Sequence, residues 1–304
     1  MVGLAVALAV AALGWFLLPS LPSRLAALPV GMLVGWCACR FGTRVLRRRL
    51  AVLARPFPPA WRDVLERRVA YYAALGKAER RRFRQLVDVF LDETPVTPAG
   101  CDVDDTCRVL VAASAVIPIF GFPAWEYNTL REVVVRGEQF DFRFPGQDLE
   151  TTGILGLVGN AGGAFHGTMV LSKADLLAGF EAGGGKHHVG IHEFAHLIDQ
   201  ADGAIDGVPA SLPRECLRPW LRLVRAELER GWEGWSDIPE YAFTNEQEFF
   251  AVAAEYFFQA PSELVGNHPE LYDLLQQVFR QNTRSRLRTL VGRRKSFRRR
   301  KRRA

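Results

Sequence analysis

HEFAH, residues 192–196, lies inside the largely apolar run VGIHEFAHLID of residues 189–199. On a helix, His192 and His196 are one turn apart on the same face, so both imidazoles can reach one metal ion. Glu193 follows the first histidine directly, which places its carboxylate beside the metal's open position, where it can move a proton. The alternative, a buried helix with hydrogen-bonded histidines, leaves the glutamate unexplained. The spacing therefore predicts zinc chemistry of the peptidase kind.

A catalytic zinc ion takes three protein ligands, so the two histidines require one more. Four acids are candidates: Asp199, Asp202, Glu248 and Glu255. Asp202 has the offset used when a tight glycine turn follows the second histidine, but position 199 is aspartate, which argues against that turn. Asp199 is better placed to accept a hydrogen bond from the ring N–H of a ligand.

Glu248 and Glu255 lie two helical turns apart in residues 244–258, which are apolar on nearly every face. Thr244 and Gln247 predict a capping box at the start of this helix. A helix this apolar is expected to be buried, so its two glutamates need a cation or a hydrogen-bonding partner. Glu248, nearest the helix start, is the predicted third ligand. Glu255 is either an outer contact of a ligand or part of a structural ion pair.

The remaining histidines are expected outside the metal site. His187 and His188 precede the face of the metal helix, so exposed or capping positions are favoured over ligation. His166 and His268 stand alone in the sequence.

The charge of the chain is concentrated at its end. The formal charge is +6, but Arg293 to Arg303 contain nine basic residues and no acid, which leaves −3 for the rest. The tail, residues 293–304, favours a solvated or anionic-lipid-facing segment over a folded nucleic-acid reader. The five cysteines show no CxxC pair, so a reducing compartment is expected and neither a disulfide framework nor a cysteine metal site.

Two apolar runs, Val2–Leu18 and Leu25–Cys39, begin the chain. They predict a membrane hairpin over residues 1–40, with a single anchor as the alternative. Arginines crowd the linker that follows, residues 41–56, and by the positive-inside rule they would keep the rest of the chain in the cytoplasm. An untethered cytoplasmic protein is the alternative location.

The third part, residues 57–292, is expected to be one α+β domain. Apolar residues at helical spacing predict two helices between Trp61 and Asp92, separated at Gly76, and a third from Asp104 to Pro118. Strands are expected over residues 129–135, 154–158 and 168–171, followed by a short helix for which Ser172 and Asp175 predict a capping box.

The expected architecture is zincin-like, with an N-terminal helical layer, a small, mostly antiparallel sheet and two metal-bearing helices. An edge strand near the metal helix would pair with extended substrate. The predicted edge strand consists of Thr168, Met169, Val170 and Leu171.

The motif HEFAHLID and the later segment YAFTNEQEFFA, residues 241–251, together resemble the Mlc titration factor A family of bacterial zinc peptidases, whose catalytic core is similar to that of anthrax lethal factor. The resemblance covers roughly residues 57 to 285. It implies zinc bound by His192, His196 and Glu248, with Glu193 as catalytic base and Tyr241 as transition-state donor. It also implies aminopeptidase activity on small substrates and binding of a transcriptional repressor.

The predicted function is therefore zinc-dependent hydrolysis of a peptide or protein substrate. A regulatory protein-binding module, in which hydrolysis is secondary, is the alternative. The presence of both Glu193 and Tyr241 favours the enzyme, because a docking module needs neither a base nor a phenol at the metal.

Overall fold

A computed structural model describes residues 21–137, 167–181 and 185–286 of the chain. The chain divides into two compact units, Met1–Pro56 and Phe57–Ala304. The expected strand over residues 154–158 and the basic tail lie outside the described residues.

The first unit contains two described helices, α2 (Leu21–Gly42) and α3 (Arg44–Ala54). Within the described residues, no helix is long and apolar enough to cross a membrane. The expected second pass, Leu25–Cys39, lies in α2 and does not meet that requirement. At 1.5 Å per residue this run is about 22 Å long, shorter than the roughly 30 Å of a bilayer core. The expected first pass, Val2–Leu18, lies outside the described residues.

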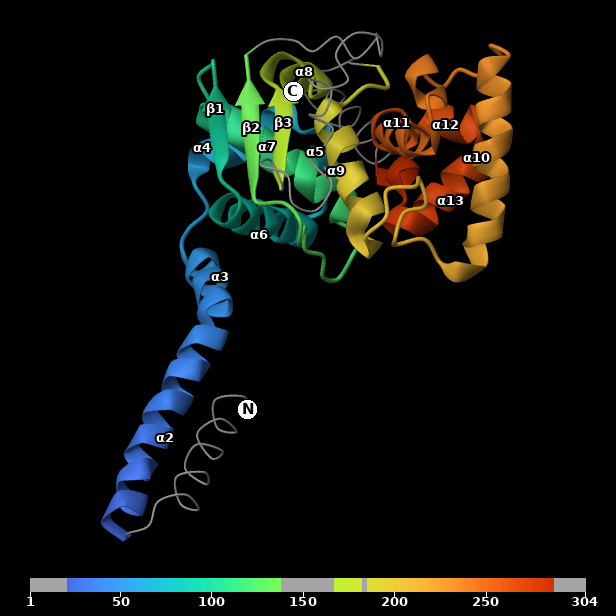
Figure 1. Cartoon of the computed structure of the whole chain (residues 1–304). Helices are drawn as coiled ribbons and strands as arrows, with labels where there is room; N and C mark the ends of the chain where they lie inside the picture. Colours follow the sequence, from blue (N-terminus) through green and yellow to red (C-terminus); the bar gives the residue numbers. More distant parts are fainter. Residues whose placement is uncertain (1–20, 138–166, 182–184, 287–304) are drawn as a thin grey trace. The chain divides into compact units, whose positions relative to one another are not determined.

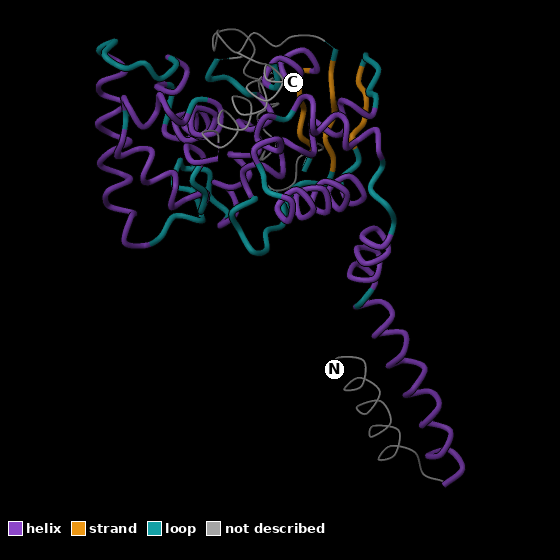
Figure 2. Tube along the Cα trace, turned by 180° about the vertical axis from the view of Figure 1, so that it is seen from behind, coloured by secondary structure: helices purple, strands orange, loops and turns teal. Residues whose placement is uncertain are grey.

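The second unit is built around α7 (Asp105–Ile119), which is buried on nearly all sides. Asp104 caps this helix by accepting a hydrogen bond of 2.8 Å from the backbone N–H of Cys107. Because α7 is apolar all round, it can pack against several elements at once. The helices α4 (Pro59–Arg68) and α6 (Lys77–Glu93) contact α7, and the short α5 (Ala70–Ala74) joins them. Figure 2 shows these helices beside the sheet from behind.

The sheet contains three described strands in the order β1 (Val96–Ala99), β2 (Glu132–Arg136) and β3 (Thr168–Ser172). Both pairs are parallel, with Val96 beside Val133 and Val133 beside Met169. These three side chains are buried, which gives the sheet one apolar face.

The α+β class is confirmed, but the expectation of a mostly antiparallel sheet is wrong. Parallel strands require a long crossover between them, and α7 is the crossover from β1 to β2. Residues 137–167, between β2 and β3, are also far longer than a hairpin turn. The sequence interpretation missed β1, a strand of four residues that contains Pro98, and therefore missed this crossover.

The helix that carries the two histidines of the HEFAH motif, α9 (Val189–Asp199), comes after the last strand of the sheet in the chain. Figure 1 shows α9 between β3 and α11 (Glu246–Gln259), and α9 contacts both. The other elements of this half are α8 (Lys173–Gly179), η2 (Gln200–Asp202), η3 (Arg214–Cys216), α10 (Leu217–Trp232), η4 (Glu240–Phe243), α12 (Pro261–Asn267) and α13 (Pro269–Phe279).

Two predicted caps have different outcomes. Ser172 caps α8 by accepting a hydrogen bond of 3.3 Å from the N–H of Asp175, as the sequence predicted. The capping box of Thr244 and Gln247 is wrong, because α11 begins one residue later. Its cap is Asn245, whose Oδ1 accepts from the N–H of Glu248 at 2.9 Å.

Candidate metal centre

Three side chains from two helices converge on one point. Nε2 of His192 and Nε2 of His196, both on α9, are 3.2 Å apart. The carboxylate of Glu248, on the first turn of α11, places Oε2 3.0 Å from His192 Nε2 and Oε1 3.6 Å from His196 Nε2. Within the described part of the chain, this is the one group of three or more His, Cys, Asp or Glu side chains that could hold a metal ion.

The donor set fits a divalent cation. All three side chains are buried. Oε2 of Glu248 has almost no access to solvent and makes no hydrogen bond of acceptable geometry. Leaving such a carboxylate oxygen unsatisfied is costly, and a cation between it and the imidazoles would remove that cost. The three residues could therefore hold a metal ion without rearrangement of the two helices.

Close packing of α9 against α7 fixes the position of the histidines. A Cβ atom added to Gly190 would lie 2.2 Å from Oγ of Ser114 on α7, so only glycine allows the two helices to approach this closely. His188 caps α9, and its Nδ1 accepts a hydrogen bond of 3.2 Å from the N–H of Ile191. Together these contacts fix the start of the helix that carries His192 and His196.

Glu255 contacts the other side of the first histidine. Its Oε1 lies 2.7 Å from Nδ1 of His192, and its Oε2 accepts a hydrogen bond from the backbone N–H of His188. A carboxylate on Nδ1 favours the tautomer with the proton there, which leaves the lone pair of Nε2 directed at the metal position. Burial alone would raise the pKa of Glu255, but the imidazoles of His187 and His192 beside its carboxylate lower it to about 2.

Residues 43–280 match the sequence profile of the family described as glucose-regulated metallo-peptidase M90. The match covers well over half of the chain. The chain belongs to the M90 family of metallopeptidases.

Curated relatives of this M90 chain align over most of their own length. An uncharacterised protein of Synechocystis sp. is 28% identical over 246 residues, which are 76% of this chain and 87% of that protein. Mlc titration factor A of Escherichia fergusonii is 28% identical over 244 residues, 76% of this chain and 89% of its own. Mlc titration factor A of an Enterobacter species is 27% identical over 246 residues, with shares of 76% and 89%. The resemblance to this family is thus confirmed.

Glu193 of the M90 chain lies on α9 next to the first histidine and is buried. Burial raises the pKa of its carboxyl, and the imidazoles of His192 and His196 offset this only in part. The pKa of Glu248 has the opposite direction. Burial would raise it, but the two imidazoles facing the carboxylate hold it far below its usual range. The two carboxyls therefore differ in proton affinity: Glu248 stays ionised, as a cation ligand must be, whereas Glu193 holds a proton more readily.

Tyr241 lies in the short η4 helix, with its ring centroid 6.0 Å from that of His192. Burial and the nearby Glu248 carboxylate raise the pKa of its phenol, so the O–H remains a hydrogen-bond donor at neutral pH. Packing against α10 fixes η4. A Cβ atom at Gly231 would lie 2.2 Å from the ring of Phe243, and Trp232 Nε1 donates to Phe243 O at 3.0 Å.

The two aspartates considered as ligands lie elsewhere. Asp202 is exposed in η2, and its Oδ1 accepts from the N–H of Ala204 at 3.1 Å. Asp199 is buried, and its Oδ2 accepts from the N–H of Gly207 at 2.9 Å, which fixes the turn after the metal helix. Its Oδ1 and the Nδ1 of His196 are both buried without a hydrogen-bond partner.

A polar network around Asp237 was not foreseen from the sequence. Asp237 lies in the loop before η4, and Nε2 of His268 is 2.6 Å from its Oδ1. Its Oδ2 accepts from Lys186 at 2.6 Å and from Tyr256 and Asn267, each at 2.7 Å. These partners are distant in sequence, and no local spacing signals that they meet. The network ties the loop before Tyr241 to the segment before α9.

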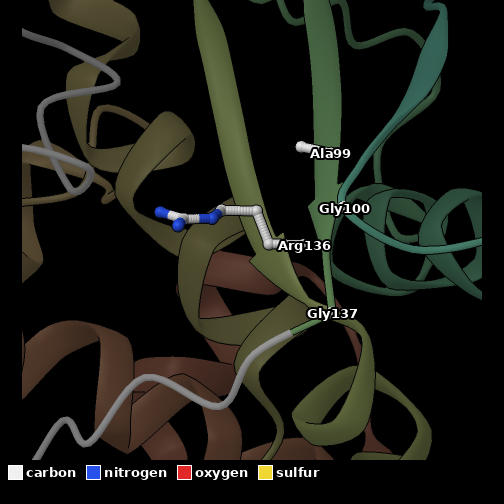
Figure 3. Close-up of a pocket in the computed structure, with 4 residues that line it drawn as sticks. All are labelled: Ala99, Gly100, Arg136 and Gly137. Carbon is white, nitrogen blue, oxygen red and sulfur yellow. The ribbon is translucent and has the colours of Figure 1, made fainter.

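A hollow of about 350 Å³ lies away from the metal-binding residues. Figure 3 shows it at the carboxyl ends of β1 and β2, lined by Ala99, Gly100, Arg136 and Gly137. Gly137 is the last described residue before position 167, so the lining of this hollow is described only in part, and we assign it no function. The expected substrate strand, β3, forms one edge of the described sheet and contacts α9.

Proposed function

We propose that this M90 protein is a zinc-dependent peptidase with a zincin-like core, in which His192, His196 and Glu248 bind the ion. The observation that carries the proposal is the separation of 3.0 to 3.6 Å between their facing atoms. Ligands 2.0–2.2 Å from a tetrahedral zinc ion would be about 3.3–3.5 Å apart. Two imidazoles and a carboxylate are a ligand set of catalytic zinc peptidases, and they leave the fourth position open.

A zinc ion held there supplies Lewis-acid chemistry that makes water a nucleophile at neutral pH. The remaining steps belong to the protein. Glu193 accepts the proton of the attacking water and donates it to the amine nitrogen as the peptide C–N bond breaks. The phenol of Tyr241 donates a hydrogen bond to the carbonyl oxygen as negative charge develops on it. Glu255 orients His192 through Nδ1, and Asp199 fixes the end of the metal helix.

The substrate is proposed to bind as an extended chain along β3. Its residues Thr168, Met169, Val170 and Leu171 lie at the edge of the described sheet, on the side of α9. An edge strand offers backbone N–H and C=O groups to an added strand. The family resemblance favours removal of N-terminal residues. Peptides with free and acetylated amino ends would separate this from internal cleavage.

A comparison of the full chain with Glu193→Gln tests the proposal. Both proteins should bind one zinc ion, whereas peptide hydrolysis by the variant should fall by a factor on the order of 10² or more. The matched control is Glu263→Gln, an exposed glutamate on α12. Undiminished hydrolysis by Glu193→Gln, or a fully metal-free wild-type protein after incubation with zinc, would reject the peptidase.

A second role rests on the names of the relatives, two of which are called Mlc titration factor A. We propose on this ground that the chain also binds a transcriptional regulator. If binding is the primary role, Glu193→Gln should retain it while losing hydrolysis.

All five cysteines are unpaired, which supports action in a reducing compartment such as the cytoplasm.

A further inference from the structure

Exposed apolar side chains are concentrated in the first unit. Of the fourteen large hydrophobic residues that are exposed among the described side chains, ten lie between positions 30 and 53, in α2 and α3. The other four, Leu217, Leu221, Trp232 and Trp235, belong to the second unit, which is several times larger. Such concentration of exposed apolar surface marks a binding surface rather than ordinary surface composition.

The helix α3 separates apolar from basic side chains. Leu46, Leu50 and Leu53 follow at intervals of four and three residues, which places them on one face of the helix. Their side chains are 57%, 57% and 40% exposed. Arg44 and Arg48 lie about half a turn away from this leucine face and are also exposed.

The charge of this segment has a single sign. No aspartate or glutamate occurs before Asp63, whereas Arg40, Arg44, Arg47, Arg48, Arg49 and Arg55 lie in or next to α2 and α3. Arg47 and Arg49 follow Leu46 and precede Leu50, so guanidinium groups flank the leucine face on both sides. A nucleic acid would use the arginines but has no use for the exposed leucines. A surface that is both acidic and partly apolar would contact the arginines as well as the exposed leucines.

We propose that α3, with the end of α2, lies on the surface of an anionic phospholipid bilayer. Leu46, Leu50 and Leu53 enter the boundary between headgroups and acyl chains, and the flanking arginines contact lipid phosphates. A helix of eleven residues can bind in this way without spanning, since it lies in the plane of the interface. The proposal uses no residue of the metal centre, so it does not depend on peptidase activity.

Vesicle flotation of the full chain tests the proposal. Vesicles of phosphatidylcholine with phosphatidylglycerol should carry the protein to the top of the gradient more strongly than vesicles of phosphatidylcholine alone. Added salt should weaken this binding, because it screens the arginines. The double variant Leu46→Ser and Leu50→Ser should weaken binding on the order of tenfold, and Arg44→Gln with Arg48→Gln should do so by a similar factor.

The helix α10 offers matched controls. Leu217 and Leu221 are exposed leucines at the same spacing of four residues, and Arg218 and Arg222 are exposed arginines at that spacing. The double variants Leu217→Ser with Leu221→Ser, and Arg218→Gln with Arg222→Gln, should bind vesicles as strongly as the wild type. Thermal unfolding and zinc content should be unchanged in all four double variants.

Three results would overturn the proposal. Equal binding to neutral and anionic vesicles would exclude recognition of anionic lipid. Wild-type binding by both α3 variants would assign the membrane contact to another segment, such as the basic tail. Loss of vesicle binding in the arginine variant alone would show that the surface is purely electrostatic. RNA binding would then be measured, and wild-type RNA affinity of the leucine variant would indicate a nucleic-acid partner.

Discussion

Nδ1 of His192 lies 2.7 Å from Oε1 of Glu255, on the side of the imidazole opposite to Glu248. One histidine thus connects two glutamates that are seven residues apart on α11, and it joins the metal helix to the second helix through both of its nitrogens. Outer carboxylates of this kind set ring orientation and raise the basicity of the ligand.

Glu255→Gln should weaken zinc binding without abolishing it. The amide keeps the shape of the side chain but removes the charge that favours a proton on His192 Nδ1, so zinc affinity should fall about 10–100-fold. Competition with a chromophoric chelator measures this directly. Glu270→Gln, an exposed glutamate on α13, is the control. An affinity within twofold of the wild type would mean that Glu255 is a structural ion pair and does not tune the ligand.

Glu248→Ala should have a larger effect, because it removes a ligand rather than the partner of one. Zinc affinity should fall by more than about 100-fold, beyond the range of an outer contact, and hydrolysis should be lost with it. Glu246→Ala is the matched control, since Glu246 is exposed in the same helical turn. Full zinc occupancy of Glu248→Ala at low free zinc would move the third ligand to another acid.

The sequence was sufficient for features that depend on local spacing. The metal helix and the approach of Glu248 follow from periodicity, from a buried charge and from family resemblance. The direction of the strands could not be obtained in this way. It depends on the crossover through α7, and the short β1, with its proline, gives almost no strand signal.

Long-range polar contacts were also beyond local reasoning. His268 seemed isolated in the sequence, yet it lies between Glu227 and Asp237, which are contributed by α10 and by the loop before η4. The error at Thr244 arose because Thr244 and Asn245 are both good N-caps. The side chain of Gln247, expected to complete the capping box, donates through Nε2 to Ile205 O, a contact distant in sequence.

Tyr241→Phe should change turnover and little else. The ring would still pack 6.0 Å from His192, so zinc content and KM should stay close to those of the wild type. Loss of the phenolic donor should lower kcat on the order of 100-fold, about 3 kcal/mol of transition-state stabilisation. Tyr272→Phe, which removes a phenol on α13, controls for a general effect of the substitution. Unchanged kcat would exclude Tyr241 as the donor.

His268 gives a prediction about stability and pH. Its Nε2 is 2.6 Å from Oδ1 of Asp237, and its Nδ1 is 3.2 Å from Oε1 of Glu227. Burial would lower the pKa of this imidazole, but the two carboxylates outweigh burial and raise it. A pKa that is higher in the folded than in the unfolded chain stabilises the fold fully below about pH 6.5. This stabilisation is lost as the pH rises through the folded-state pKa.

His268→Gln should therefore cost most at mildly acidic pH. Near pH 6 the variant should lose on the order of 2 kcal/mol of unfolding free energy, typical of hydrogen bonds to charged groups. The difference from the wild type should shrink as the pH rises through the folded-state pKa, because the wild-type imidazole then loses its proton. Urea unfolding at several pH values measures both quantities. A difference that is constant with pH would show that His268 is neutral in the folded protein and that its two carboxylate neighbours do not hold a proton on it.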